Sequence, residues 1–246
     1  MLENYQDYIE AAGKTRSLKD IHALCSDMCN HYGFDHFVYG ARFPTSLLNP
    51  KIVFISGYPT QWWERYKSEN YMRIDPLVAH CEHNITPIRW DCIQRDLLES
   101  PNISRFMSEA VDSGLRNGLS IPVHTSNGEF AMLNFSTSDS PEKSSDHIIQ
   151  GTPEVYLLTN YIHEAVTRIV DALGEDKPLV KLTNRERECL LWAADGKTAW
   201  ETAQILKVSE RTIVWHIQNA QSKLKTVSRQ QTVARAISRG IISPQL

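Results

Sequence analysis

The sequence predicts an α+β protein of two parts: an N-terminal α/β/α sandwich around a mainly antiparallel sheet, and a C-terminal all-α helix-turn-helix domain of four helices. Three observations support this. Residues 1–173 mix helical with strand periodicity, residues 174–181 contain glycine and proline at a change of charge, and residues 182–246 carry repeated helix-capping signals. We therefore expect domains at 1–173 and 182–246, joined by a linker at 174–181.

The N-terminal elements follow from hydrophobic periodicity. Apolar residues at three- and four-residue spacing predict helices over 17–32, 103–113 and 153–173. Strands are expected at 34–43 and 52–56, and a hairpin around Asn127-Gly128 joins strands 118–125 and 129–137. Residues 136–145 are expected to be a polar loop. The apolar stripe of the 153–173 helix, which includes Ile162, either packs on the sheet, the default, or forms a dimer seam.

Helix-capping signals dominate residues 182–246. Four N-cap candidates precede apolar periodic stretches: Thr183, Thr198, Ser209 and Ser228. All but Ser209 are followed by the Glu or Gln of a capping box. These signals predict helices over 183–194, 198–206, 210–225 and 229–239. A three-residue turn between the second and third is typical of a helix-turn-helix.

The third of these helices has two chemically different faces. One face is apolar, whereas the other carries Arg, Gln and Asn, which match base edges and phosphates, and an outward tryptophan. The alternative is the polar face of a generic helical bundle, but turn length, charge and face chemistry together favour DNA. The residues expected to contact DNA are Thr198, Ser209, Arg211, Thr212, Val214, Trp215, Gln218, Asn219 and Lys223.

Charge and composition narrow the function further. The chain has a net charge of -3, yet residues 178–246 hold 11 basic and 5 acidic side chains, a balance that favours nucleic acid. The longest apolar run, at 189–194, is too short to span a membrane, and the N-terminus has no secretory pattern. Five cysteines without framework spacing predict buried thiols in a reducing cytoplasm. The 80–83 segment (HCEH) lacks a second ligand pair, so no metal site is expected.

Residues 182–242 closely resemble the LuxR-type DNA-binding domain. The resemblance lies in LTNRERECLLWAADGKTAWETAQILKVSERTIVWHIQNAQSKL and SRQQTVARAISRGII. It implies that the third helix enters the major groove, that the fourth contributes to a dimer, and that Val214, Trp215 and Gln218 occupy base-reading positions.

An aromatic face stands out in the N-terminal part. Tyr58, Trp62 and Tyr66 recur every four residues, and Asp75 and Trp90 follow. Such residues suit a mostly apolar pocket with few polar groups, although on spacing alone core packing is favoured. The N-terminal half also resembles the autoinducer-binding domain of LuxR-type quorum-sensing receptors, on these residues: Trp62, Tyr66, Asp75, Pro76, Trp90 and Gly118.

That resemblance implies an N-acyl-homoserine lactone as ligand and no cofactor. Trp62 would donate to the lactone carbonyl, Asp75 would accept the amide N–H, and Tyr58 would donate to the acyl carbonyl. Tyr66 and Trp90 would wall the pocket. Many relatives have Ser or Thr near the acyl carbonyl where this sequence has Asn134, and Ser120 is a candidate to supply the hydroxyl.

These observations predict a cytoplasmic, ligand-responsive transcription factor. It would bind a pseudo-palindromic DNA site as a homodimer, with RNA polymerase as a further candidate partner. Two alternatives remain: a different small molecule or none, and a lactone-hydrolysing enzyme. The enzyme is disfavoured because the sequence has no Gly-x-Ser-x-Gly elbow and no His-x-x-x-His motif.

Overall fold

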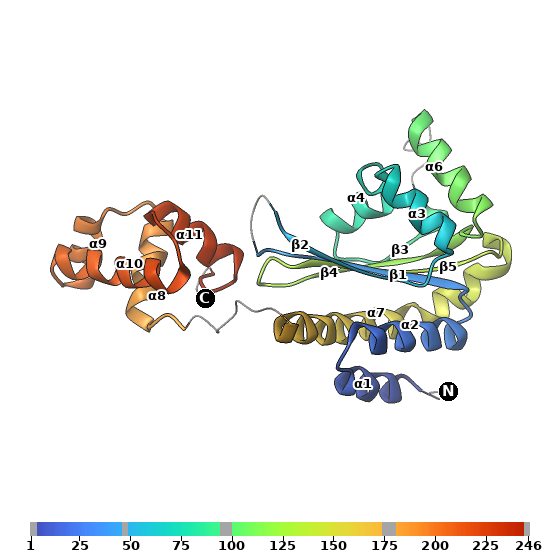
Figure 1. Ribbon diagram of the computed structural model, residues 1–246, viewed down its shortest axis with the longest axis horizontal. Coiled ribbons are helices and arrows are strands. Elements are labelled where there is room, and N and C mark those ends of the chain that lie inside the picture. The colour runs from blue at the N-terminus through green and yellow to red at the C-terminus, as the bar shows by residue number, and fades with distance from the viewer. Residues whose placement is uncertain (1–3, 46–48, 94–99, 174–180, 244–246) are drawn as a thin grey trace. The chain divides into compact units, whose positions relative to one another are not determined.

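The computed structural model describes residues 4–45, 49–93, 100–173 and 181–243. The chain divides into two compact units, one formed by most of the first 174 residues and the other mainly by residues 175–246. Within the described residues, the first unit is a five-stranded sheet between two layers of helices, and the second is a group of four helices (Figure 1). The predicted α+β class is confirmed. Most of the expected linker, 174–181, lies outside the described residues.

The sheet has the strand order β2-β1-β5-β4-β3. Its strands are β1 (His36–Phe43), β2 (Lys51–Ser56), β3 (Ile88–Arg89), β4 (Asn117–His124) and β5 (Phe130–Thr137). Strand β5 pairs antiparallel with both β1 and β4, which places Asn134 between Val38 and Ser120. Because side chains alternate between faces, even-numbered residues of these three strands share one face and odd-numbered residues the other. Every residue of β5 is buried, so both faces are covered.

Two helices cover the odd-numbered face, α2 (Leu18–Tyr32) and α7 (Pro141–Leu173), and α1 (Tyr5–Lys14) packs on the outer side of both (Figure 1). The Tyr39 hydroxyl lies 2.7 Å from His163 Nδ1 of α7, which ties strand to helix. Ile162 is only 1 % exposed, so the α7 stripe is core and the default expectation of sheet packing is confirmed. A dimer seam through this stripe is therefore not supported, because its side chains, apart from the exposed Leu173, are already buried within one chain.

The expected polar loop at 136–145 is also wrong over its second half, because α7 begins at Pro141. The buried Ser144 hydroxyl donates to the Ser140 carbonyl and accepts from the Asn117 amide, so this polar residue is satisfied inside a helix. The prediction that the cysteines are buried holds for all except Cys92, which is exposed.

Shorter elements cover the even-numbered face (Figure 1). They are α3 (Thr60–Ser68), the 3₁₀ turn η1 (Tyr71–Arg73), α4 (Pro76–His83), the 3₁₀ turn η2 (Trp90–Cys92) and α6 (Pro101–Asp112). Asp75 caps α4 and Pro76 occupies its first turn, where its missing N–H costs nothing. This layer was only partly predicted from the sequence, since α4 carries a weak apolar periodicity.

The second unit contains α8 (Asn184–Ala194), α9 (Ala199–Leu206), α10 (Glu210–Leu224) and α11 (Arg229–Ser238). These bounds agree with the predicted helices within one residue at each end. Capping boxes form at Thr183 and Thr198. At Ser228 the hydroxyl caps the helix, but the Gln231 side chain accepts from the Val227 N–H instead of completing the box. The helices pack around a small apolar core that includes Leu190, Ala220 and Leu224.

Candidate functional site

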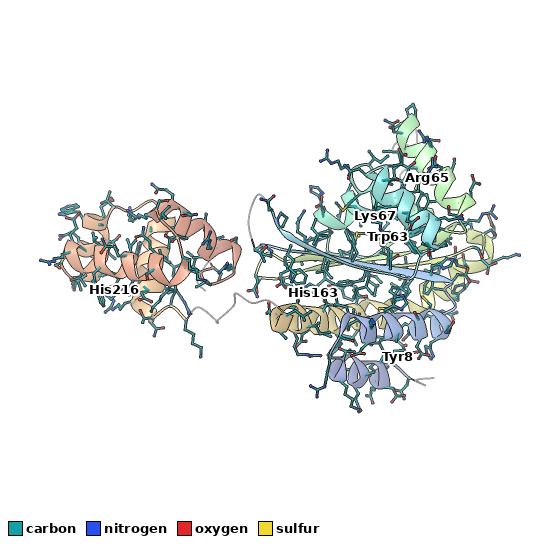
Figure 2. The ribbon with its side chains drawn as sticks, viewed as in Figure 1. Tyr8, Trp63, Arg65, Lys67, His163 and His216 are labelled. Carbon is teal, nitrogen blue, oxygen red and sulfur yellow. The ribbon has the colours of Figure 1, made fainter. Side chains whose placement is uncertain are left out.

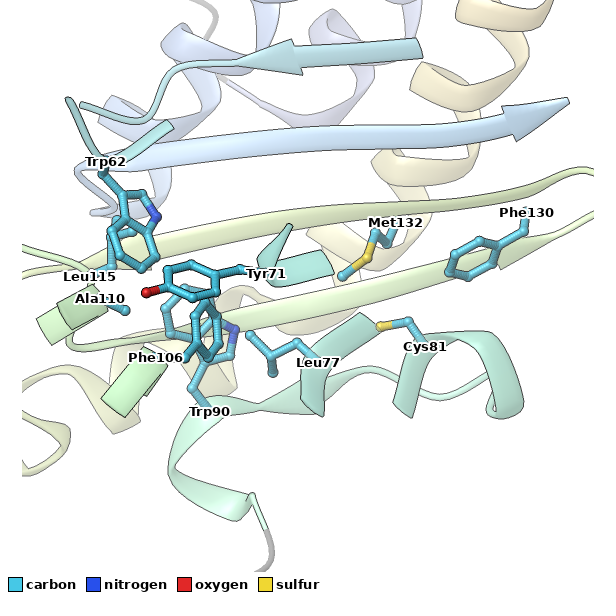
Figure 3. Close-up of a cluster of buried hydrophobic side chains, with 10 residues drawn as sticks. All are labelled: Trp62, Tyr71, Leu77, Cys81, Trp90, Phe106, Ala110, Leu115, Phe130 and Met132. Atoms are coloured by element: carbon cyan, nitrogen blue, oxygen red, sulfur yellow. The ribbon is translucent and has the colours of Figure 1, made fainter. Parts of the chain in front are cut away.

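A cavity of about 350 Å³ lies between the even-numbered face of the sheet and the layer of α3, α4 and α6. Its walls are mainly apolar, as expected of a small-molecule site. Figure 3 shows the buried cluster that surrounds much of it, with Trp62, Tyr71, Trp90 and Phe106 gathered at one end and Phe130 at the other. We call these the head end and the tail end. Of the seven predicted ligand-binding residues, six line this cavity: Tyr58, Trp62, Tyr66, Asp75, Trp90 and Asn134.

Trp62 is held at the head end by other aromatic rings. It is 3 % exposed, and its ring packs against Tyr66, Tyr71 and Phe106 at centroid distances of 5.8 to 6.2 Å. Within the described part of the chain, its indole N–H has no hydrogen-bond partner. A tryptophan N–H can only donate, so this arrangement suits an acceptor on a bound molecule.

Asp75 combines a structural role with a free acceptor site. One carboxylate oxygen, Oδ1, accepts the Leu77 N–H at 2.8 Å and caps α4, while Oδ2 accepts the Tyr66 hydroxyl at 2.9 Å. The residue is 7 % exposed. Burial raises the pKa of its carboxyl to about 6, although these hydrogen bonds oppose the shift. Each carboxylate oxygen has two lone pairs, so Oδ2 can accept one more N–H from the cavity.

Two further polar groups lie on the sheet side of the head end. Burial, and secondarily the charge of Asp75, raise the pKa of Tyr58, so its hydroxyl remains protonated and can donate. Asn134 of β5 is 7 % exposed, and its Oδ1 is buried without a hydrogen-bond partner among the described residues. An unpaired buried amide oxygen is costly, so a polar group on a ligand would improve this site.

Ser120 does not line the cavity, so its predicted contact with a ligand is not supported. Its side chain is 0 % exposed, and its hydroxyl accepts the Trp90 indole N–H at 2.9 Å. Ser120 therefore orients Trp90, which forms the wall. Gly118 makes room for that wall, because an added Cβ would lie 2.2 Å from the Phe135 carbonyl oxygen and 3.0 Å from the Trp90 ring.

A charged network that the sequence did not predict secures α6 over the head end. Glu109 of α6 accepts two hydrogen bonds from Arg65 of α3, labelled in Figure 2, both at 2.7 Å. It also accepts from Arg105 and from the Tyr71 hydroxyl. These donors hold the pKa of Glu109 near 2. The glutamate and its donors are separated by up to 44 residues, so no local pattern reveals the network.

The tail end is closed by a different ion pair. Arg42 of β1 donates to Glu82 of α4 at 2.7 Å, and the Arg42 guanidinium carbon lies 5.4 Å from the centre of the Phe130 ring. Arg42 and Phe130 are direct cross-strand partners. Both charged residues line the cavity, and neither was predicted to be part of the site.

The polar face of α10 in the second unit is exposed as predicted. Ile213 and Ile217 are buried beneath it, whereas Trp215 is 57 % and Val214 39 % exposed. Arg211 and Gln218 are also exposed on this helix. Thr212 and Asn219 are half-buried, and the Thr212 hydroxyl lies 2.7 Å from that of Ser209, which caps α10. An exposed tryptophan beside polar and basic side chains suits a surface that a partner covers.

Lys223 has a structural partner, so its predicted contact with DNA is not supported. Its ammonium group lies 2.7 Å from Oε2 of Glu186, a carboxylate whose side chain is only 4 % exposed. Glu186 also completes the capping box of α8 with Thr183. The lysine therefore balances a buried charge and joins α10 to α8.

Other kinds of site receive no support from the described residues. In that part of the chain, no three His, Cys, Asp or Glu side chains gather to hold a metal ion. None of its helices is long and apolar enough to cross a lipid bilayer.

Two known families match different parts of the chain. Residues 17–166 match the family described as autoinducer binding domain, and residues 180–236 match the family described as bacterial regulatory proteins, luxR family. The chain is 36% identical over 228 residues to the transcriptional activator VanR of Vibrio anguillarum, which covers 92% of each protein.

The chain is also similar to a second transcriptional activator and to a solved structure. The chain is 33% identical to the transcriptional activator LuxR of Aliivibrio fischeri, over 92% of this chain and 90% of that protein. Among solved structures, Escherichia coli SdiA superposes with a TM-score of 0.75 over 98% of each chain, at 24% identity. That last similarity supports the fold.

Proposed function

Because the chain belongs to the LuxR family of bacterial transcriptional regulators, we propose that its cavity binds an N-acyl-homoserine lactone and that residues 182–246 bind DNA. The chain is a ligand-responsive regulator of quorum sensing. Since the family consists of regulators, we propose no catalytic step. In this proposal residues 1–173 form the ligand-binding domain and 174–181 the linker.

The observation that carries the lactone proposal is the set of donors and acceptors at the head end. An acyl-homoserine lactone offers one amide N–H and two carbonyl groups, separated by a few bonds. Oδ2 of Asp75 would accept the N–H, Trp62 would donate to the lactone carbonyl, and Tyr58 would donate to the acyl carbonyl. Tyr66 already donates to Asp75 and keeps its carboxylate aimed at the cavity.

Asn134 adds a group that can both donate and accept. Asn134 is paired with Ser120 on the neighbouring strand β4. It borders the cavity where the first acyl carbons would lie. Its amide can donate to the acyl carbonyl or accept from a hydroxyl on the chain. We therefore propose Asn134, not Ser120, as the residue that contacts a substituent at the third acyl carbon.

The lactone proposal is tested by isothermal titration of the purified full-length protein with saturated and 3-substituted lactones. Binding that is lost in Trp62→Phe, and kept in the matched control Trp192→Phe on α8, would support it. The control lies in the second unit and does not line the cavity. A SdiA structure is described as a complex with octanoyl-rac-glycerol, so this compound belongs in the ligand set. If octanoyl-rac-glycerol binds and no lactone does, the proposed ligand would be an acylglycerol instead of a lactone.

The DNA proposal rests on the exposed polar face of α10 and on the basic balance of residues 178–246. We propose that a cytoplasmic homodimer binds a pseudo-palindromic site, since a two-fold protein matches a two-fold operator. RNA polymerase would be the downstream partner. Because ligand binding stabilises the state that binds it, the lactone would favour one arrangement of the dimer.

Selection from a randomised duplex pool, followed by affinity measurements at several salt concentrations, tests the DNA proposal. The logarithm of the association constant should fall linearly with the logarithm of the salt concentration, with a slope of about -0.9 per phosphate contact. Gln218→Ala should relax sequence preference, because it removes a side chain suited to base edges, whereas Arg211→Ala should weaken all sequences about equally. A complex that is insensitive to salt would contradict the proposal.

A further inference from the structure

The Arg42–Glu82 ion pair closes the cavity at the end farthest from the proposed lactone site. It crosses from the sheet to the helix that covers it, with Arg42 supplied by β1 and Glu82 by α4. The Phe130 ring lies beneath the guanidinium group. Ile52 and Phe54 of the edge strand β2 also line the cavity but are 46 % and 42 % exposed. The ion pair is itself partly exposed, so this end of the cavity borders solvent.

Helix α4 runs the length of the cavity and fixes the distance between its two ends. Asp75 caps its first turn and Glu82 lies in its last turn, seven residues later. At about 1.5 Å per residue these positions are about 10 Å apart along the helix. On the sheet, Asn134 and Phe130 are four residues apart on β5, or about 13 Å at the rise of a strand. The two walls give similar lengths.

An acyl chain held at Asp75 would extend toward the ion pair. An extended chain advances about 1.2 Å per bond, a third of the roughly 3.6 Å per residue of a polypeptide. About nine to eleven bonds therefore span the cavity from the ligand amide to the tail end. A shorter chain would be wholly enclosed by apolar side chains such as Met132 and Val78.

The ion pair is a barrier of modest strength. Its side chains are 48 % and 33 % exposed, and pairs with this exposure change an equilibrium constant by at most about fivefold. A longer chain must separate the two side chains to pass between them, and this cost offsets the burial of the next one or two methylenes. Affinity should therefore rise with chain length only as far as the ion pair.

We propose that Arg42 and Glu82 form the end wall of the acyl site and set the longest acyl chain that the cavity encloses, at about ten carbons. This inference rests on the proposed lactone function and adds its chain-length selectivity. Each enclosed methylene should raise affinity about fourfold, equivalent to about 0.8 kcal/mol, and further methylenes should add almost nothing.

The test is isothermal titration of the full-length protein with saturated lactones from butanoyl to hexadecanoyl. Glu82→Gln removes the charge but keeps the size, and Arg42→Met keeps an unbranched stem over Phe130. The matched control is Glu10→Gln, which breaks the exposed Lys14–Glu10 pair on α1, away from the cavity. Thermal melts of each variant without ligand show whether it is folded.

The original protein and the Glu10→Gln control should show the same break in the affinity series near decanoyl. In both tail-end variants this cost is removed, so the increase should continue for one or two more methylenes, a gain of up to about fivefold for dodecanoyl over the original protein. An unchanged break in folded Glu82→Gln and Arg42→Met would overturn the end wall while leaving the lactone site intact. If no lactone of any length binds the original protein, both proposals fail.

Discussion

Replacing Asp75 by Asn should separate ligand binding from folding. The carboxyl is buried, and its pKa rises from an ordinary value of 3.8 to about 6. At 1.36 kcal/mol per pKa unit, the ionised group costs the ligand-free protein about 3 kcal/mol at neutral pH. Asn resembles the protonated acid in size and charge. It keeps one oxygen to cap α4 through the Leu77 N–H.

The pH dependence of this cost gives the prediction its sign. Well below pH 3.8 the carboxyl is protonated in both the folded and the unfolded chain, so Asp75 costs nothing. As the pH rises toward about 6, the unfolded chain loses the proton first and the folded state becomes relatively less stable. Ligand-free Asp75→Asn should therefore match or exceed the original protein in stability at neutral pH, and the difference should shrink in acid.

Ligand binding should change in the opposite direction. In the original protein, the ligand N–H would donate to a charged acceptor, a bond worth about 1.5–3 kcal/mol. In the variant that acceptor is replaced by an amide that can present a donor to the same N–H. The lactone dissociation constant should rise at least tenfold.

Urea titrations at pH 5 and pH 8, beside isothermal titration with one lactone, measure both effects. Asp112→Asn on α6 is a matched control, because Asp112 is exposed and does not line the cavity. Lactone affinity unchanged in Asp75→Asn would refute the assigned contact. A ligand-free variant several kcal/mol less stable than the original protein would refute the electrostatic argument.

Three further changes test the structure. In the original protein, lactone affinity measured by titration calorimetry should be constant above about pH 7. Below the pKa of Asp75, about 6, it should fall at a rate approaching tenfold per pH unit. In Asp75→Asn, lactone affinity should not depend on pH over this range. Gly118→Ala should lower the free energy of unfolding, measured by urea titration, by about 1–3 kcal/mol, because the added Cβ meets the Phe135 carbonyl. Gly13→Ala, with open space around it, should leave the stability unchanged or raise it. Equal effects of the two changes would contradict the close packing at Gly118. Lys223→Met should lower the melting temperature of the second unit, because it leaves Glu186 unpaired, and adding Glu186→Gln should restore much of the loss. An unchanged melting temperature together with weaker DNA binding would instead indicate that Lys223 contacts DNA.

Local signals predicted much of the fold. The helices of the second unit were placed within one residue, because a side chain that caps a helix lies next to the backbone it caps. The strong turn signal at Asn127-Gly128 placed the β4–β5 hairpin for the same reason. Helix α1 was missed, although Asn4 and Asp7 form a capping box at its start. The signal for α4 was likewise present in Asp75-Pro76.

Side-chain roles that depend on distant partners were harder to predict. Ser120 lies 30 residues from Trp90, and Lys223 lies 37 residues from Glu186. Each residue type suited the predicted role, but tertiary contacts give it another partner. The Arg42–Glu82 pair was missed for the same reason, because neither residue belongs to a local motif. Trp62, Tyr66 and Asp75 were placed in the cavity only through the family resemblance, since spacing alone favoured core packing for the aromatic residues.

The double use of Asp75 constrains how this protein can evolve. A single carboxylate starts helix α4 and, in the proposed function, accepts the ligand amide. Apart from Asn, which can still cap α4, most residues that abandoned the amide contact would also remove the cap of the helix that covers the acyl chain. Descendants of this gene could therefore adopt new signals more readily through Asn134, Arg42 or Glu82, none of which caps a helix. New signals would then differ in the acyl chain, while the amide would remain common to all of them.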